Sequence, residues 1–305
     1  MASEETADDN AVEGIVRTMM TNPEDVYDWL GYIGLGFFTL YSLFPFYWLM
    51  VLALTPNKLI ADMGLLPKGF HPESFVTVFQ RVPLHHFLFN SFVMGVLTTI
   101  IVIFFGSIAG YVFGRLEFRG RVPLMLGILI IAYFPPAAFL IPLFRLFTGN
   151  VEFLGISFPV LFNTPGAIVF PLSALIMPLA IYILATFYNQ IPDGLEDAAR
   201  VEGSTRLGAL FKVIVPLSAP AVASIGVLTF IIVYNEFFFS YLMTNGQASS
   251  WAPIVWGILK YQGTRQVFYN LMAAASLIGI VPMAIAILLA QEKIVSGLTA
   301  GALKE

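Results

Sequence analysis

Cysteine is absent from this 305-residue chain, and only three histidines are present. The lack of cysteine excludes a disulfide scaffold, a thiolate zinc site and a cysteine nucleophile. So few histidines leave little material for a metal centre, and we expect no metal site. The net charge of -4 gives no reason to expect nucleic-acid binding.

Charged residues are also scarce, at 11% of the chain, whereas hydrophobic residues make up 58%. A soluble domain usually has about 25% charged residues. The charges here are too few to cover a water-facing surface. The composition therefore predicts a membrane protein.

The few charges are unevenly distributed. Residues 1–28 hold eight acids and one base, which leaves 14 bases and 11 acids in the rest of the chain. A secretory signal would begin with a positive segment, so we expect this acidic start to be retained. We interpret residues 1–28 as an acidic cytoplasmic tail, helical near its end, where Asn22-Pro23 can start a helix.

Six apolar stretches are long enough to cross a bilayer as helices, which takes roughly 20 residues each. They lie near residues 30–54, 87–114, 122–146, 160–187, 214–243 and 268–291. We predict an all-α membrane protein with six transmembrane helices in one permease domain, residues 29–291. Residues 292–305 form a short cytoplasmic carboxyl tail in this prediction.

The basic residues of the connections predict the orientation, because cytoplasmic loops carry more Lys and Arg. With both termini cytoplasmic, the inner face has nine bases and the outer face has six. Much of the excess lies in the short loop from Arg115 to Arg121. We therefore predict that both termini are cytoplasmic.

Three glycines follow one another at four-residue spacing in the second span: Gly106, Gly110 and Gly114. Small residues at this spacing let two helices approach closely in a membrane. No Lys-Ser or Lys-Thr follows them, so the pattern favours helix packing over a phosphate-binding loop.

Glu236 is the one carboxylate deep in a predicted span, within Tyr234-Asn235-Glu236. A charge at membrane depth costs about 2.5 kcal/mol or more and usually faces a bundle interior or a water-filled path. Two interpretations stay open: a place on a translocation pathway, or a structural contact to a neighbouring helix.

The segment between spans four and five is more ordered than a loop. Asp193 and Glu196 have the spacing of a capping-box variant, and Gly203 is placed to end the helix in a left-handed turn, with Ser204 capping the next helix. Leu195, Ala198, Ala199 and Glu202 share one face of that helix. This shallow, mostly apolar face favours docking to a soluble partner. An interfacial helix would be rich in Lys and Arg.

The same segment resembles the EAA motif of ABC importer permeases, which reads Glu-Ala-Ala, three residues, Gly, nine residues, Ile-x-Leu-Pro. Here it reads Asp197-Ala198-Ala199, then Gly203, then Val213-Ile214-Val215-Pro216, with both spacings kept. Asp replaces Glu, and Val replaces both Ile and Leu. Glu196 supplies a neighbouring carboxylate.

The resemblance extends from about Leu30 over nearly the whole chain, and it is closest to the smaller permease subunit of maltose-transporter-type importers. The matching blocks are Asn90-Ser91, Tyr111 to Arg121, Phe139 to Leu143, Tyr234 to Phe237 and Gly297 to Ala302. Residues 1–28 fall outside the resemblance.

The resemblance implies a subunit of an ATP-driven importer of a sugar or oligosaccharide in a prokaryotic inner or plasma membrane. Its partners would be a second permease, two cytoplasmic ATPase subunits and an extracytoplasmic sugar-binding protein. The chain has no GxxxxGK[ST] segment, so ATP and Mg would be bound by the ATPase subunits, with no cofactor in this chain and no enzyme activity of its own.

Residue roles follow from the same resemblance. The ATPase-coupling helix would comprise Leu195, Glu196, Asp197, Ala198, Ala199, Arg200 and Gly203, with motion passing to span five through Val213 to Pro216. A translocation pathway would involve Tyr234, Asn235 and Glu236. The binding-protein contact would lie in the outer loop 244–266, with Trp251, Trp256, Tyr261 and Gln262.

Three alternatives stay open from the residues alone. An ion-coupled secondary carrier would have several ionisable groups at mid-membrane, and only Glu236 is found. A membrane-embedded hydrolase would require a catalytic constellation at depth, and none is visible. A permease for glycerol phosphate belongs to the same family of importers as a sugar permease.

Overall fold

The computed structural model describes residues 23–153 and 156–302, and these fold almost entirely into helices. The first half of the chain forms α2 (Pro23–Leu54), η1 (Asn57–Asp62), α3 (Ser74–Arg81), α4 (Leu84–Arg115), α5 (Arg121–Ala132), α6 (Ala137–Phe147) and a hairpin of β1 (Glu152–Phe153) and β2 (Ile156–Ser157). The second half forms α7 (Gly166–Asn189), α8 (Asp193–Val201), α9 (Arg206–Ala209), η2 (Leu210–Ile214), α10 (Val215–Leu217), α11 (Ala219–Tyr234), α12 (Phe238–Met243), η3 (Ala248–Ser250), α13 (Ile254–Leu259) and α14 (Tyr269–Ala302).

Four of these helices are long and apolar enough to cross a membrane: α2, α4, α7 and α14. Two bent pairs pass the same test, α5 with α6 at 86° and the helix ending at Leu217 with α11 at 84°. The predicted helical membrane architecture is confirmed. The number of spans is four, or up to six if each bent pair crosses once, so six spans stays a prediction.

Two predicted spans are not single helices. The predicted span 122–146 breaks between α5 and α6 at Pro135-Pro136, because two consecutive prolines remove two amide donors and disfavour helix in the residue before them. The predicted span 214–243 bends at Ser218, just before Pro220, and its last helix ends at Tyr234 before α12 begins. Single prolines, such as Pro45 and Pro282, lie inside continuous helices.

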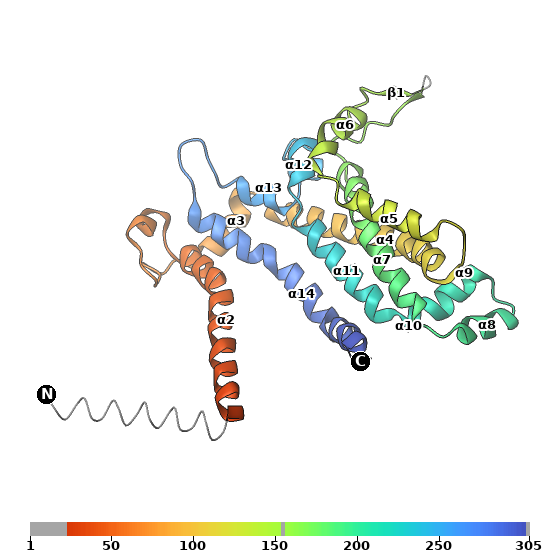
Figure 1. The fold of residues 1–305 in the computed structure, drawn as a ribbon. Coiled ribbons are helices and arrows are strands. Elements are labelled where there is room, and N and C mark those ends of the chain that lie inside the picture. Colours follow the sequence, from red (N-terminus) through yellow and green to blue (C-terminus); the bar gives the residue numbers. More distant parts are fainter. Residues whose placement is uncertain (1–22, 154–155, 303–305) are drawn as a thin grey trace.

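The core is built around α4, which packs against α7 and α11 (Figure 1). The three glycines of α4 lie against α7, where the sequence pattern predicts close packing. A Cβ atom added at Gly110 would lie 2.9 Å from the Cβ of Leu184, and one added at Gly114 would lie 2.7 Å from the carbonyl oxygen of Ala185. At Gly106 the nearest atom would be the Cβ of Ala180, at 3.4 Å.

The two ends of the bundle carry different elements. In Figure 1, α8 and α9 lie at one end of the α4–α7 pair, and α6, α12 and the β hairpin lie at the other. An apolar cluster of Tyr111, Leu184, Tyr188, Leu210 and Ile214 joins α4, α7 and η2 near the α8 end. The bundle end next to α8 is therefore well packed.

Helix α2 lies apart from the core and packs mainly against α14 (Figure 1). Its apolar side chains from Tyr27 to Met50 are mostly exposed. The predicted acidic tail lies outside the described residues up to position 22, and residues 23–28 form the first turns of α2. At the other end α14 continues to Ala302, beyond the predicted start of the carboxyl tail at 292.

Candidate functional site

The segment with the EAA-like spacing forms helix α8, a turn at Gly203 and helix α9. Gly203 has a φ of 93°, the left-handed conformation that its position predicts. The predicted caps are wrong. Asp193 lies inside α8, which follows Pro192 and has no side-chain cap, and α9 is capped by the hydroxyl of Thr205, which accepts a hydrogen bond from the Gly208 amide, rather than by Ser204.

Glu196 points into the bundle. It is the one buried residue of α8, and the hydroxyl of Tyr111 donates a hydrogen bond to its Oε1 at 2.5 Å. The guanidinium of Arg115 donates from Nε to its Oε2 at 3.0 Å. The carboxylate is thus satisfied by two groups of α4 and cannot also serve as a capping box.

The opposite side of the α8–α9 segment is open. Leu195 is 45% exposed, Val201 89% and Leu207 54%, and Ala198 is also exposed. Asp197 forms an ion pair with Arg200 at 3.7 Å, one turn apart on the same exposed surface. Large apolar side chains on a short polar helix outside the bundle core are typical of a surface that another protein covers.

The three residues expected at the pathway lie around the break that ends α11. Tyr234 is buried and donates a hydrogen bond to the carbonyl of Gly279 in α14 at 2.8 Å. Glu236 is buried, and its carboxylate accepts hydrogen bonds from the amides of Phe239 and Ser240 at the start of α12. These two side chains join helices.

Asn235 differs from its two neighbours. Its side chain is exposed, and its amide donates to the carbonyl of Ile231 at 3.0 Å and lies 3.2 Å from the sulfur of Met283. The side-chain amide of Asn235 is thus exposed at a helix break between apolar segments. Of the three predicted residues, the structure leaves Asn235 open.

The loop 244–266 is tied to the bundle by polar anchors. Asn90 of α4 donates to the carbonyls of Ala248 and Ala252 at 2.7 and 3.0 Å, and Ser91 accepts from the amide of Ile254 at 2.8 Å. The buried environment raises the pKa of Tyr261, whose hydroxyl donates to a backbone carbonyl of α3 at 2.7 Å. Tyr261 is therefore too buried to contact a partner protein.

The longest exposed stretch of this loop is its tip, residues 262–266, closed by a bridge between Gln262 and Val267. Trp256 is half-buried and stacks on Tyr241 with ring centroids 5.9 Å apart. Trp251 is also half-buried and has a φ of 59°. Of the four residues expected to contact a binding protein, Gln262 is the one at the exposed tip.

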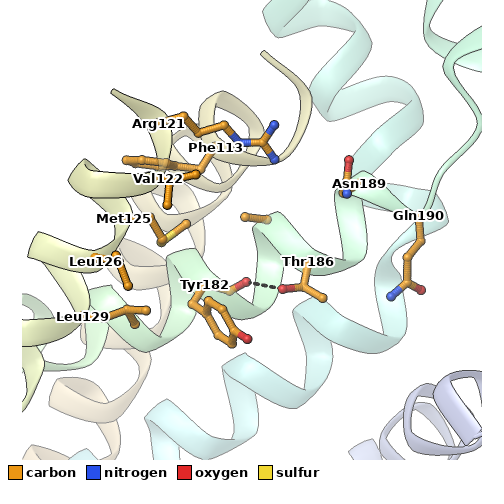
Figure 2. Close-up of a pocket in the computed structure, with 11 residues that line it drawn as sticks. Phe113, Arg121, Val122, Met125, Leu126, Leu129, Tyr182, Thr186, Asn189 and Gln190 are labelled. Atoms are coloured by element: carbon orange, nitrogen blue, oxygen red, sulfur yellow. Dashed lines mark hydrogen bonds between the residues drawn. The ribbon is translucent and has the colours of Figure 1, made fainter. Parts of the chain in front are cut away.

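A pocket of about 390 Å³ lies between α5 and α7 (Figure 2). Val122, Met125 and Leu126 form its α5 wall, and Arg121, Asn189 and Gln190 lie toward one end. Across the pocket, Tyr182 and Thr186 of α7 add hydroxyl groups to the lining.

Within the described residues, no group of three or more His, Cys, Asp or Glu side chains gathers to hold a metal ion. Sequence reasoning missed Tyr111 and Arg115 as partners of Glu196. The available signal was their four-residue spacing, which puts them on one face of α4 one turn apart. It could not indicate that the face meets α8, because Tyr111 and Glu196 are 85 positions apart in the sequence.

The apolar spanning helices, together with an exposed helical segment at one end of the bundle, are features of a membrane protein that assembles with a partner. Residues 103–292 match the family model described as "Binding-protein-dependent transport system inner membrane component". The chain belongs to this family of inner-membrane permease components. It is a multi-pass protein of the prokaryotic inner membrane.

Several curated proteins are similar over most of their length. The sulfoquinovosyl glycerol transport permease SmoH of Agrobacterium fabrum is 35% identical, with 90% of this chain and 93% of that protein covered. The trehalose/maltose transport permease MalG of Thermococcus litoralis is 34% identical, with coverage of 89% and 95%. The trehalose transport permease SugB of Mycobacterium tuberculosis is 33% identical, with coverage of 87% and 93%.

A solved structure shares the fold. A chain of a bacterial ABC transporter that imports the acidic polysaccharide alginate has a TM-score of 0.72 at 19% identity, with 90% of this chain and 98% of that chain covered. A second structure of a bacterial alginate transporter, in complex with an alginate pentasaccharide-bound periplasmic protein, has a TM-score of 0.61 at 17% identity. The family membership decides against an ion-coupled carrier and a membrane-embedded hydrolase.

Proposed function

We propose that this chain forms half of the translocation pathway of an ATP-driven, binding-protein-dependent importer of a sugar or oligosaccharide. The three relatives reported above are permeases for glycosides or disaccharides by name, and each matches nearly its full length. A second, homologous permease would supply the other half. A permease for glycerol phosphate stays the alternative, and the names of these three relatives favour a sugar.

The observation that carries the proposal is the exposed apolar surface of α8 and α9. Leu195, Val201 and Leu207 lie outside the bundle core, and the described chain does not cover them. A short amphipathic helix of this kind docks into a groove on a partner protein. We assign that partner as the cytoplasmic ATPase, which would bind ATP and Mg in place of this chain.

An interfacial position for α8 is the competing interpretation. Asp193 and Asp197 are exposed on α8, and Glu202 is exposed directly after it. Membrane surfaces on the cytoplasmic side carry anionic lipids and attract basic segments. The exposed acids would be repelled there, so the charge pattern favours a protein partner.

This assignment places α8, and with it both termini, on the cytoplasmic side. Because the chain lacks cysteine, single-cysteine variants give a clean test with a membrane-impermeant thiol reagent applied to intact cells. Cysteine at Glu117 should be protected, and cysteine at Thr264 should be labelled. The opposite labelling pattern would reject the orientation.

The docking test uses Ala199 on α8. Ala199→Arg should abolish uptake and weaken ATPase binding, because it adds a long charged side chain to the proposed contact. Ala199 is half-buried; Ala61→Arg, at an exposed alanine of η1, is the control and should leave both unchanged. Cross-linking of Ala199→Cys to the ATPase gives a direct readout. Normal uptake by Ala199→Arg together with no cross-link would reject the assignment.

The tip of the loop 244–266 is the proposed contact for the extracytoplasmic binding protein. Its exposed residues are Gln262 to Gln266, whereas Tyr261 and the two tryptophans hold the loop in shape. Deleting residues 263–265 should leave the complex assembled but remove the stimulation of ATP hydrolysis by the binding protein. Persistent stimulation would place the contact elsewhere.

Of the three residues predicted for the translocation pathway, we propose that Asn235 contacts the solute. Tyr234 and Glu236 make internal hydrogen bonds, and only Asn235 of the three has an exposed side chain. Asn235→Leu should lower the rate of uptake without lowering the amount of assembled complex. Unchanged uptake would leave Asn235 as a surface residue of the bundle.

A further inference from the structure

We propose that Tyr111, Arg115 and Glu196 form a polar clamp that makes α8 move with α4, so that the α4–α7 pair receives the motion of the ATPase directly. The clamp is a positioning device and rests on the proposed docking of α8. It differs from a route through Val213 to Pro216 into α11, which runs along the chain.

The first support is that α8 has almost no apolar anchor in its own chain. Glu196 is its one buried residue, and Leu195 and Val201 face outward. Burial of such side chains would stabilise the contact, and α8 lacks that contribution. Its position relative to the bundle therefore depends on polar contacts.

The second support is the geometry at Glu196. Tyr111 and Arg115 lie one turn apart on the last turns of α4, and each holds a different oxygen of the carboxylate, at 2.5 and 3.0 Å. The Tyr111 residue is 3% exposed and the side chains of Arg115 and Glu196 are 4% and 10% exposed. Two donors on two oxygens fix the orientation of the carboxylate as well as its place.

Arg115 also holds the chain where it enters α8. Its Nη1 donates to the carbonyl oxygen of Ile191 at 2.6 Å and lies 2.9 Å from Oδ1 of Asp193. The planar guanidinium offers several donors in a rigid fork. One side chain of α4 thus contacts the linker, the first residue of α8 and Glu196 one turn later.

The third support is the difference between the two connections from α8 into the bundle, one through α4 to α7 and one through η2 to α11. Above Arg115, the glycines at 110 and 114 bring α4 into close contact with α7, and closely packed interiors transmit displacement. Toward α11, the chain passes through η2, a π-helical turn, and then an 84° bend. The clamp connects α8 to α4 directly through side chains, whereas the other route runs along the backbone through η2, against which α8 also packs.

The test uses the complete importer in lipid vesicles and needs no knowledge of the transported solute. The measured quantity is the stimulation of ATP hydrolysis by the binding protein purified from its native cells, per assembled complex. Glu196→Gln and Tyr111→Phe should each lower the stimulation by roughly tenfold, the size expected for losing a buried hydrogen bond to a charged group. A merely structural role would lower the amount of complex but not its stimulation.

Glu117→Gln is the matched control, because Glu117 is an exposed acid two residues beyond Arg115. It should keep its stimulation within about twofold of the parent protein, well short of the tenfold factor that corresponds to 1.4 kcal/mol. The double variant of Tyr111 and Glu196 should be no worse than the more affected single variant, since both remove one unit. Unchanged stimulation in both single variants would overturn the clamp.

Cross-linking of Ala199→Cys to the ATPase separates the two proposals. If the cross-link forms in all variants and stimulation falls only in the clamp variants, both docking and clamp are supported. If the cross-link forms but the clamp variants are stimulated normally, docking holds and the clamp is rejected. If the cross-link is absent from the otherwise unchanged chain, docking fails and the clamp fails with it. Should Glu196→Gln not assemble, Tyr111→Phe, which loses one hydroxyl, decides.

Discussion

The contact between α4 and α7 gives the sharpest stability prediction. Replacing Gly110 by alanine would put a methyl carbon 2.9 Å from the Cβ of Leu184 and 3.3 Å from the amide nitrogen of Ala185. Carbon atoms prefer separations of about 3.5–4.0 Å, so the space is short by roughly 1 Å. Neither neighbouring atom can turn away by changing rotamer, and the two helices must separate.

The expected size of the effect comes from overpacking, which costs about 1–3 kcal/mol in closely packed cores. Alanine also favours a helix over glycine by about 0.8–1 kcal/mol, which opposes the clash. Gly127→Ala in α5 has the same helical gain, and a Cβ there would meet no atom within 4 Å. The difference between the two variants therefore isolates the clash.

The assay is detergent-induced unfolding of the purified complex, followed by a spectroscopic signal of helix content. Gly110→Ala should have a free energy of unfolding about 1–3 kcal/mol below that of Gly127→Ala. Equal stability of the two variants would refute the reasoning, since it would mean that α7 can yield by about 1 Å at no cost.

Three further predictions concern buried polar contacts. Glu236→Ala should lower the free energy of unfolding by about 1–2 kcal/mol, because two amides at the start of α12 lose their acceptor. Glu236→Gln should cost less, and equal losses for the two variants in the unfolding assay would contradict this. Asn90→Ala should remove the side-chain donor that holds the carbonyls of Ala248 and Ala252 and make residues 244–266 more sensitive to protease, and unchanged cleavage would count against the anchor. Tyr261→Phe should cost about 0.5–1.5 kcal/mol, because the carbonyl of Val78 loses one of its two donors and keeps the amide of Val82, and a neutral result in the same unfolding assay would mean that water replaces the hydroxyl.

Local pattern predicted much of the fold. Long apolar runs indicated the spanning helices, and the spacing of Gly203 indicated a left-handed turn that the structure has. Pro135-Pro136 carried the signal for a break, but the apolar pattern continues across it and conceals the bend. Proline alone is a weak guide, because Pro45 sits in an unbroken helix.

The site was harder to predict, because its contacts join residues far apart in the chain. Asp193 and Glu196 have the spacing of a cap, yet Glu196 is taken by Tyr111, 85 positions away. The aromatic residues of the outer loop suggested a contact surface, but Tyr261 is held by a backbone carbonyl 183 positions away. In both cases a residue distant in the sequence determines the contact, and the local sequence does not indicate which residue that is.

The isolation of α2 has a consequence for how the chain is made. Among the described helices, α2 is synthesised first, and its main helical partner, α14, is synthesised last. While the helices between them are made, α2 must therefore remain in the bilayer with lipid, or another polypeptide, on nearly every side. A chain truncated before α14 would leave α2 in that state.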